Sequence, residues 1–265
     1  MDLALRTARY LFLTLLVIFL VLPLVVVAGV SLNGSAQMVF PPQAPGLRWY
    51  AEFFGNPAWT SAFQRSLLIA ALAALLATAT ALPVAYVQWR LKSRLANILA
   101  GLGSLPFLLP SIVLAILFLL FWSVLGHVGR LENIVVSHAV TYLAVPLTMI
   151  SLGFSTIDNE LVESAQTMGA PDEHVFRTVI LPLIAPYMIS SMIFVGIFSL
   201  NEVLISYMVG GWSTETLPVK IFTSLRTGFT PAMCVAAVLF LAIGVLGFIT
   251  VARLGNLPRL LGARG

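Results

Sequence analysis

Residues 159–182 read NELVESAQTMGAPDEHVFRTVILP and form a polar segment between two long apolar runs. Asp158 or Asn159 suits the N-cap of a helix, because a short side-chain oxygen there accepts a hydrogen bond from a free backbone N–H. Gly169 suits the left-handed residue that follows a helix, and Pro171 cannot continue one. The segment therefore predicts a helix, a turn and the start of a second helix.

Two further features of this segment support the prediction. Apolar residues recur at helical spacing and define one face of the first helix; they are Leu161, Val162, Ala165 and Met168. Asp172 and Glu173 stand where the second helix would begin, and the helix dipole favours carboxylates at that end. We therefore expect a shaped surface here rather than a plain linker.

The same segment resembles the EAA loop of binding-protein-dependent ABC importer permeases. That loop reads Glu-Ala-Ala, three residues, Gly, nine residues, Ile, one residue and Leu-Pro, and the spacing is kept here. Ser164 stands at the second position and Val179 at the Ile position, and both changes are small in volume. The candidate coupling residues are Glu163, Ser164, Ala165, Gly169, Leu181 and Pro182.

The resemblance implies an all-α integral membrane protein with the MetI-like ABC permease fold, in which a cytoplasmic coupling helix lies between spans four and five. In that family the coupling helix docks into a groove on an ATPase subunit. The implied partners are two ATP-binding subunits, a second permease subunit (homologous or identical) and an extracytoplasmic solute-binding protein. Ala165 and Gly169 would allow close backbone approach, and an exposed Glu163 would pair with a basic partner.

The composition places the chain among membrane proteins. Of its 265 residues, 60% are hydrophobic and only 9% are charged, whereas soluble domains carry roughly 25% charged residues. The net charge of +4 does not indicate nucleic-acid binding, because the basic residues stand at the ends of apolar runs. We expect contact with membrane lipid and none with nucleic acid.

The sequence carries no motif for chemistry of its own. It contains no Gly-x-x-x-x-Gly-Lys-Ser/Thr loop, no HExxH and no GxSxG, so any ATP must be hydrolysed by another polypeptide. The single cysteine, Cys234, excludes an intrachain disulfide. We therefore expect a transport subunit rather than an enzyme, without cofactor or metal.

Six segments with few charges are long enough to cross a bilayer, which takes about 20 apolar residues. We expect one permease domain over residues 1–265, with a coupling loop at 158–182. The predicted spans are 10–30, 66–89, 98–126, 133–157, 183–209 and 230–253. The first apolar stretch exceeds the usual 7–15 residues of a signal peptide, so we interpret it as a retained span. Pro106 and Pro110 predict a kink or a break in the third span.

The distribution of Lys and Arg predicts the orientation, since positive charge favours the cytoplasmic side. With six spans and the N-terminus inside, nine basic residues lie inside and five outside. The inner set is Arg6, Arg9, Arg90, Lys92, Arg94, Arg177, Arg253, Arg259 and Arg264, and the outer set is Arg48, Arg65, Arg130, Lys220 and Arg226. We expect a multi-pass protein of the bacterial inner membrane with both termini in the cytoplasm.

Polar residues in the fifth span are candidates for a translocation path. Glu202 is the only carboxylate within a predicted span, and an ionised group in lipid costs on the order of 3 kcal/mol or more, so it should face the bundle or water. The candidate path residues are Ser199, Asn201, Glu202 and Ser206. A structural ion pair or an interfacial position for Glu202 is an equal alternative. For His138 in the fourth span, an interhelical hydrogen bond is favoured over a proton relay.

Short phrases outside the loop resemble the spermidine/putrescine branch of these permeases. They are Phe-Pro-Pro-Gln at 40–43, Leu-Arg-Trp-Tyr at 47–50, which we expect to start a short helix, and the outer loop 210–226 with Trp212 and Leu217-Pro218. The branch has two acids in span five, whereas this chain has Asn201-Glu202.

The resemblance implies an ABC importer permease for a polyamine-like cation. Opines, aminophosphonates and ferric iron are the other solutes of the branch. An ion-coupled secondary transporter that uses Glu202 as its carrier is the alternative from another class, and a membrane scaffold without transport is a third.

Overall fold

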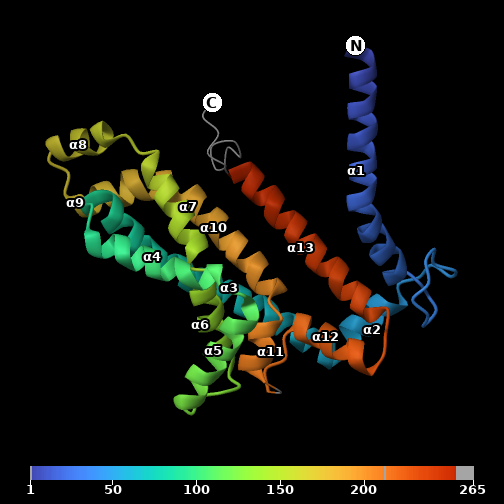
Figure 1. The fold of residues 1–265 in the computed structure, drawn as a ribbon. Coiled ribbons are helices and arrows are strands. Elements are labelled where there is room, and N and C mark those ends of the chain that lie inside the picture. Colours follow the sequence, from blue (N-terminus) through green and yellow to red (C-terminus); the bar gives the residue numbers. More distant parts are fainter. Residues whose placement is uncertain (1, 212, 255–265) are drawn as a thin grey trace. The chain divides into compact units, whose positions relative to one another are not determined.

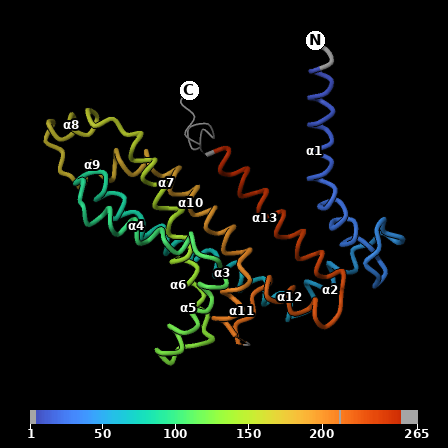
Figure 2. Tube along the Cα trace, in the orientation of Figure 1, coloured from blue at the N-terminus to red at the C-terminus, as the bar shows by residue number. Residues whose placement is uncertain are grey.

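The computed structural model describes residues 2–211 and 213–254, and apart from one isolated bridge its regular structure there is helical. Trp212, Arg259 and Arg264 lie outside the described residues. The chain divides into two compact units. Unit 1 consists of residues 1–61 and 220–242, and unit 2 consists of residues 62–219 and 243–265. Figure 1 and Figure 2 trace the helices along the chain.

Unit 1 contains α1 (Asp2–Ser31), α2 (Arg48–Gly55) and parts of longer helices. The predicted short helix after residue 47 is confirmed by α2, which buries Trp49 and Phe53. The Trp49 indole N–H donates to the Ser35 carbonyl at 3.1 Å, so this ring is held inside unit 1. Residues 5–25 of α1 are exposed on all sides of the helix and mostly apolar, as expected of a helix that faces lipid.

Unit 2 holds the core of the fold. Its helices are α3 (Pro57–Leu91, from residue 62), α4 (Arg94–Leu108), α5 (Ser111–Val124), α6 (Leu131–Thr141), α7 (Ala144–Ser155), α8 (Asn159–Thr167), α9 (Asp172–Val175), η1 (Phe176–Ile180), α10 (Leu181–Asn201) and α11 (Leu204–Gly210). The α12 helix (Leu217–Thr227) and the α13 helix (Ala232–Leu254) each cross from one unit to the other. Within unit 2, α10 packs against α7 and α11 packs against α5.

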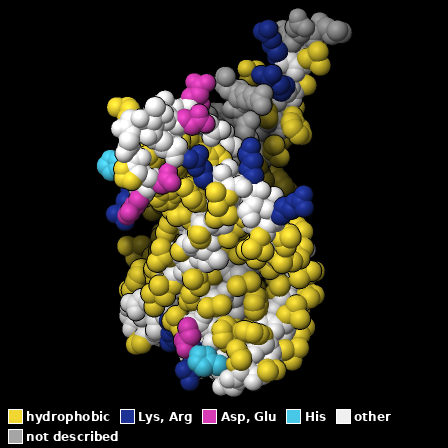
Figure 3. Space-filling model, turned by 90° about the vertical axis from the view of Figure 1, so that its left-hand side faces the viewer, with side chains coloured by type: hydrophobic (Ala, Val, Ile, Leu, Met, Phe, Trp, Pro, Cys, Tyr) yellow, Lys and Arg dark blue, Asp and Glu magenta, His cyan; other side chains and the backbone are white. Residues whose placement is uncertain are grey.

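The described helices provide up to six membrane spans. Four are continuous: Leu5–Ser31, Pro57–Leu91, Asp172–Asn201 and Ala232–Arg253. The other two are bent pairs, α4 with α5 at 112° and α6 with α7 at 48°. On the face that carries α4, α5 and α8, hydrophobic side chains cover a broad band and charged side chains gather toward its ends, as in a membrane protein (Figure 3).

The third and fourth predicted spans are therefore broken rather than continuous. Pro110 disfavours a helical conformation at Leu109, which is extended and ends α4, so the predicted break is confirmed. In the fourth span, Pro146 has no N–H to donate to the Tyr142 carbonyl, and the chain bends between Tyr142 and Ala144.

The fifth span differs from its predicted bounds at both ends. It begins at Asp172, because α9, the π-helical segment η1 and α10 run on as one helix. Its continuous helix stops at Asn201, because Glu202 is extended and the chain starts a new helix at Leu204. The predicted span 183–209 is therefore broken at Glu202 into α10 and α11.

The predicted outer loop 210–226 is also partly helical. Leu217 begins α12, and Pro218 stands in its first turn, where the missing N–H costs nothing. The Leu217 N–H donates to the Ser66 hydroxyl at 2.8 Å, which fixes this helix start on α3. The Leu-Pro pair thus marks a helix start within the predicted loop.

Candidate functional site

The coupling segment folds as predicted around α8. The Asp158 carboxylate caps the helix by accepting the Glu160 N–H at 3.0 Å. Gly169 follows the helix with φ +86°, a left-handed conformation that glycine adopts without strain. The next helix starts at Asp172 directly after Pro171. We call residues 158–182 the coupling surface.

Apolar contacts attach the coupling surface to the rest of unit 2. Val162 of α8 and Val175 of α9 are buried in one cluster with Phe154 of α7. Beneath them the rings of Trp89 and Phe154 stack with centroids 5.1 Å apart, which adds to the apolar burial. These contacts orient α8 against the ends of α3 and α7.

A polar relay provides a second attachment. The Arg90 guanidinium, at the end of α3, donates to the Gln166 side-chain oxygen of α8 at 3.1 Å. The Gln166 amide donates to the Asp172 carboxylate at 2.6 Å. Arg90 thus supports the coupling helix from within the chain. It is one of the basic residues that we expect on the cytoplasmic side.

The apolar stripe predicted on α8 is not buried as a whole. Val162 and Ala165 face the core, whereas Leu161 is 49% exposed and Met168 is 87% exposed. The helix therefore presents large apolar side chains to the outside, which is typical of a surface that binds a partner.

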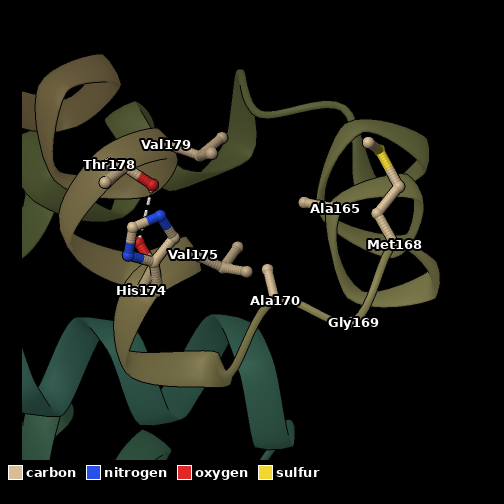
Figure 4. A pocket seen from close by; sticks show the side chains of 8 residues that line it. All are labelled: Ala165, Met168, Gly169, Ala170, His174, Val175, Thr178 and Val179. Carbon is tan, nitrogen blue, oxygen red and sulfur yellow. Dashed lines mark hydrogen bonds between the residues drawn. The ribbon is translucent and has the colours of Figure 1, made fainter.

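A pocket of about 480 Å³ opens between α8 and the next helix (Figure 4). Ala165, Met168 and Gly169 line it on one side, and His174, Val175 and Thr178 line it on the other. The Thr178 hydroxyl donates to the His174 carbonyl at 2.7 Å and keeps that wall helical. Ala165 and Gly169 on the α8 side have small side chains or none, which leaves room in the pocket.

The six candidate coupling residues fall into two groups. Glu163, Ser164, Gly169 and Pro182 are exposed, whereas Ala165 and Leu181 are half-buried and contact the core cluster. The coupling surface carries five exposed carboxylates: Asp158, Glu160, Glu163, Asp172 and Glu173. Arg177 forms an ion pair with Glu173 at 2.7 Å. The coupling surface therefore combines exposed carboxylates with exposed apolar side chains.

A second polar site lies inside unit 2, around Glu202. Its Oε2 accepts the Tyr142 hydroxyl at 2.8 Å and the Ser111 hydroxyl at 3.4 Å. Its Oε1 accepts the backbone N–H groups of Leu204 and Ile205 at 3.0 and 3.2 Å. The Glu202 side chain is buried, and among the described residues no Lys, Arg or His forms an ion pair with it.

His138 connects both sides of the same break. Its Nδ1 lies 2.7 Å from the Ser199 hydroxyl of α10, and its Nε2 lies 3.2 Å from the Ser206 hydroxyl of α11. All three side chains are buried. The expectation of an interhelical hydrogen bond for His138 is confirmed.

The comparisons with known proteins agree with this architecture. The family described as "Binding-protein-dependent transport system inner membrane component" matches residues 77–257. The putrescine transport system permease protein PotI of Escherichia coli K12 is 31% identical over 240 residues, which cover 87% of this chain and 85% of PotI.

The chain belongs to this permease family. It is a transport subunit and not an enzyme. The spermidine/putrescine transport system permease protein PotC of Haemophilus influenzae is 28% identical over 197 residues, covering 74% of this permease and 77% of PotC. The resemblance to the spermidine/putrescine branch is thereby confirmed.

The fold of the permease is also that of a chain in a solved ABC transporter structure. A crystal structure of a bacterial alginate ABC transporter, in complex with an alginate pentasaccharide-bound periplasmic protein, contains a chain that matches with a TM-score of 0.68. The match covers 100% of this permease and 96% of that chain at 17% identity, which shows the fold alone.

The candidate path residues of the permease differ in burial around the helix break. Ser199, Glu202 and Ser206 are buried, whereas Asn201 is exposed and its amide donates to the Ile197 carbonyl at 2.8 Å. An unbroken helix would have kept the first three on one stripe, but here their side chains meet through His138 and Tyr142. Sequence reasoning left Ser111 and Tyr142 out of the site, although Ser111 directly follows Pro110 and Tyr142 stands at the bend four residues before Pro146.

Proposed function

We propose that this permease pairs with a second permease subunit and binds two ATP-binding subunits through the coupling surface. Residues 1–265 then form one permease domain with six spans and both termini in the cytoplasm. An extracytoplasmic binding protein delivers the solute, and ATP-driven closure of the ATPases moves α8 and rocks the helical bundle.

The observation that carries this proposal is the coupling surface itself. Leu161 of α8 and Met168 at its C-terminal end are exposed next to the pocket, and the same segment carries exposed carboxylates. A groove with an apolar floor and basic edges is complementary to such a surface. Since the chain has no phosphate-binding loop of its own, a nucleotide-hydrolysing partner at this surface would supply the energy.

For the solute we propose a small organic cation, in first place a polyamine. PotI and PotC, the relatives of this permease, are named for putrescine and for spermidine/putrescine. Asn201 is exposed at the break of the fifth span and would line the path, with Ser199, Glu202 and Ser206 behind it. Opines, aminophosphonates and ferric iron are the alternative outcomes of the transport assay below.

Substitution of Gly169 tests the coupling surface. Gly169→Trp places a bulky side chain at the edge of the pocket, and co-purification of the ATPase subunits should be lost while the permease still inserts into the membrane. Gly126→Trp is the matched control, because Gly126 also has a positive φ (+65°) and open space where a Cβ would stand. Gly169→Ala separates backbone strain from bulk. Normal assembly with Gly169→Trp would refute the assignment of this surface.

Transport by the reconstituted complex tests the solute and the energy source. Proteoliposomes that contain both permease subunits and the ATPases, supplied with the binding protein, should take up labelled putrescine or spermidine only with ATP. Uptake by this permease alone under a proton gradient would instead support an ion-coupled transporter. Uptake of an opine, an aminophosphonate or ferric iron in place of polyamines would overturn the proposed solute.

A further inference from the structure

Three helix breaks of unit 2 meet at the Glu202 carboxylate. Ser111 is the first residue of α5, directly after the break of the third span. Tyr142 is the residue that follows α6, at the bend of the fourth span. Glu202 itself follows α10, at the break of the fifth span. One side chain therefore contacts the discontinuity of all three broken spans.

The chemistry of the contacts suits an ionised carboxylate. All four partners are donors: two hydroxyls on Oε2 and two backbone N–H groups on Oε1. An ionised carboxylate only accepts hydrogen bonds, and both oxygens of Glu202 act only as acceptors here. The structural ion pair considered for Glu202 does not occur among the described residues, and its side chain is occupied by protein donors. We call Glu202 and these four donors the Glu202 clasp.

The clasp joins two packed pairs of helices. The breaks at Ser111, Tyr142 and Glu202 form a layer, which we call the break layer. On one side of it α10 packs against α7, and on the other side α11 packs against α5. Between α10 and α11 the backbone is not helical at Glu202, so no continuous ladder of backbone hydrogen bonds fixes the angle between the pairs. Apolar contacts with α3 act on both pairs, and the hydrogen bonds across the break come from the clasp and from His138.

We infer that Glu202 is a positioning residue, which sets the angle between the α7–α10 pair and the α5–α11 pair. Its carboxylate holds the start of α5, the end of α6 and the start of α11 in one arrangement. When the importer bundle rocks, each of these two helix pairs then moves as a rigid body about the break layer. The inference does not depend on which solute the permease carries.

Distances between spin labels on the purified full-length permease in lipid nanodiscs test the inference. Cys234, the only cysteine, is first replaced (C234A). One label pair crosses the break layer, at Leu120→Cys on α5 and Leu183→Cys on α10. The other pair stays within one packed pair and shares a label, at Thr148→Cys on α7 and Leu183→Cys. All three positions are exposed, and the Thr148 hydroxyl bonds only within its own helix.

Glu202→Leu should shift and broaden the distance distribution of pair 120–183 and leave that of pair 148–183 unchanged. Tyr142→Phe and Ser111→Ala should each broaden the 120–183 distribution less than Glu202→Leu does. Combining either substitution with Glu202→Leu should cause no further broadening. Glu202→Asp keeps both oxygens on a shorter stem and should fall between wild type and Glu202→Leu. Ser104→Ala is the control, because the Ser104 hydroxyl bonds only to Ala100 of its own helix.

Two results would overturn the inference. One is an unchanged 120–183 distribution in Glu202→Leu, and the other is an equal broadening of both pairs, which would mean general loss of packing. Tyr142→Phe and Ser111→Ala keep the test decisive if Glu202→Leu fails to fold. The readout involves neither solute nor ATPase, so its failure leaves the proposed import function standing, and failed import leaves the clasp standing.

Discussion

The coupling surface and the Glu202 clasp belong to the same unit but keep their shape by opposite means. The coupling surface has buried apolar residues, Val162 and Val175, beneath exposed charges. The clasp has a buried carboxyl group, Glu202, whose hydrogen-bond partners also lie inside the bundle. Polar groups are thus on the outside in one region and on the inside in the other.

This difference decides what each region is able to do. Exposed polar groups exchange partners with water at little cost, so a surface built from them can bind and release another subunit. A buried carboxylate without its donors pays a large desolvation cost, so it keeps one arrangement. The coupling surface is suited to a contact that forms and breaks, and the clasp is suited to a joint.

We expect the largest effect on stability from Glu202→Leu in the clasp, compared with the same substitution, Glu163→Leu, on the coupling surface. Glu202→Leu leaves two hydroxyls and two backbone N–H groups without their acceptor. Since each unsatisfied buried donor costs about 1–3 kcal/mol, we expect a loss of at least about 3 kcal/mol in the free energy of unfolding. Glu163→Leu replaces an exposed carboxylate and should change that free energy by less than about 0.5 kcal/mol.

Thermal unfolding of both variants in detergent measures this difference. Glu163→Leu should in addition weaken ATPase binding, which Glu202→Leu should affect only through the shape of the bundle. Equal stability of the two variants would show that the clasp does not hold unit 2 together.

The two regions also differ in how far the sequence predicts them. The coupling surface follows from local signals, because a cap at Asp158, a left-handed Gly169 and a following Pro171 each act on their own neighbours. The clasp joins Glu202 to residues 60 and 91 positions away, which no local pattern encodes.

The break at Glu202 shows the limit of periodicity most clearly. The third span breaks at Pro110, as expected, but the end of α10 has no proline or glycine between Ser199 and Val203. The helix stops because the Glu202 carboxylate caps α11 instead of continuing the turn. Apolar composition predicts that this stretch lies in the membrane, whereas the division into two helices goes with the local bonds to Leu204 and Ile205 and the tertiary bonds to Tyr142 and Ser111.

A smaller effect is expected from the polar relay that supports α8. Gln166→Ala removes the bonds to Arg90 and Asp172 but leaves the apolar contacts of Val162 in place. A net loss of about 1 kcal/mol should speed amide exchange over residues 159–167 about fivefold, because local opening limits that exchange. Hydrogen–deuterium exchange with mass spectrometry measures the rate.

Gln88→Ala is the matched control for Gln166→Ala. Gln88 also donates a side-chain amide near the surface, to Asn97 at 3.0 Å, but this bond does not reach α8. The amide exchange rate over residues 159–167 in Gln88→Ala should equal that of the wild type. If Gln166→Ala behaved in the same way, the apolar contacts alone would hold the coupling helix, and the contrast between the two regions would become sharper.

The smallest effect is expected at Arg177, in the π-helical segment of the coupling surface. Arg177→Met removes an ion pair with Glu173 whose two side chains are 71% and 73% exposed. Exposed pairs at this spacing contribute about 0.3–0.5 kcal/mol and are screened by salt. The unfolding temperature should therefore fall slightly at low salt and not at all at high salt. Because Glu173 then loses its partner, binding of a basic ATPase groove should tighten at low salt. A loss of stability that persists at high salt would instead show that Arg177 supports the π-helical turn itself, and the coupling surface would then depend on its charged groups as the clasp does.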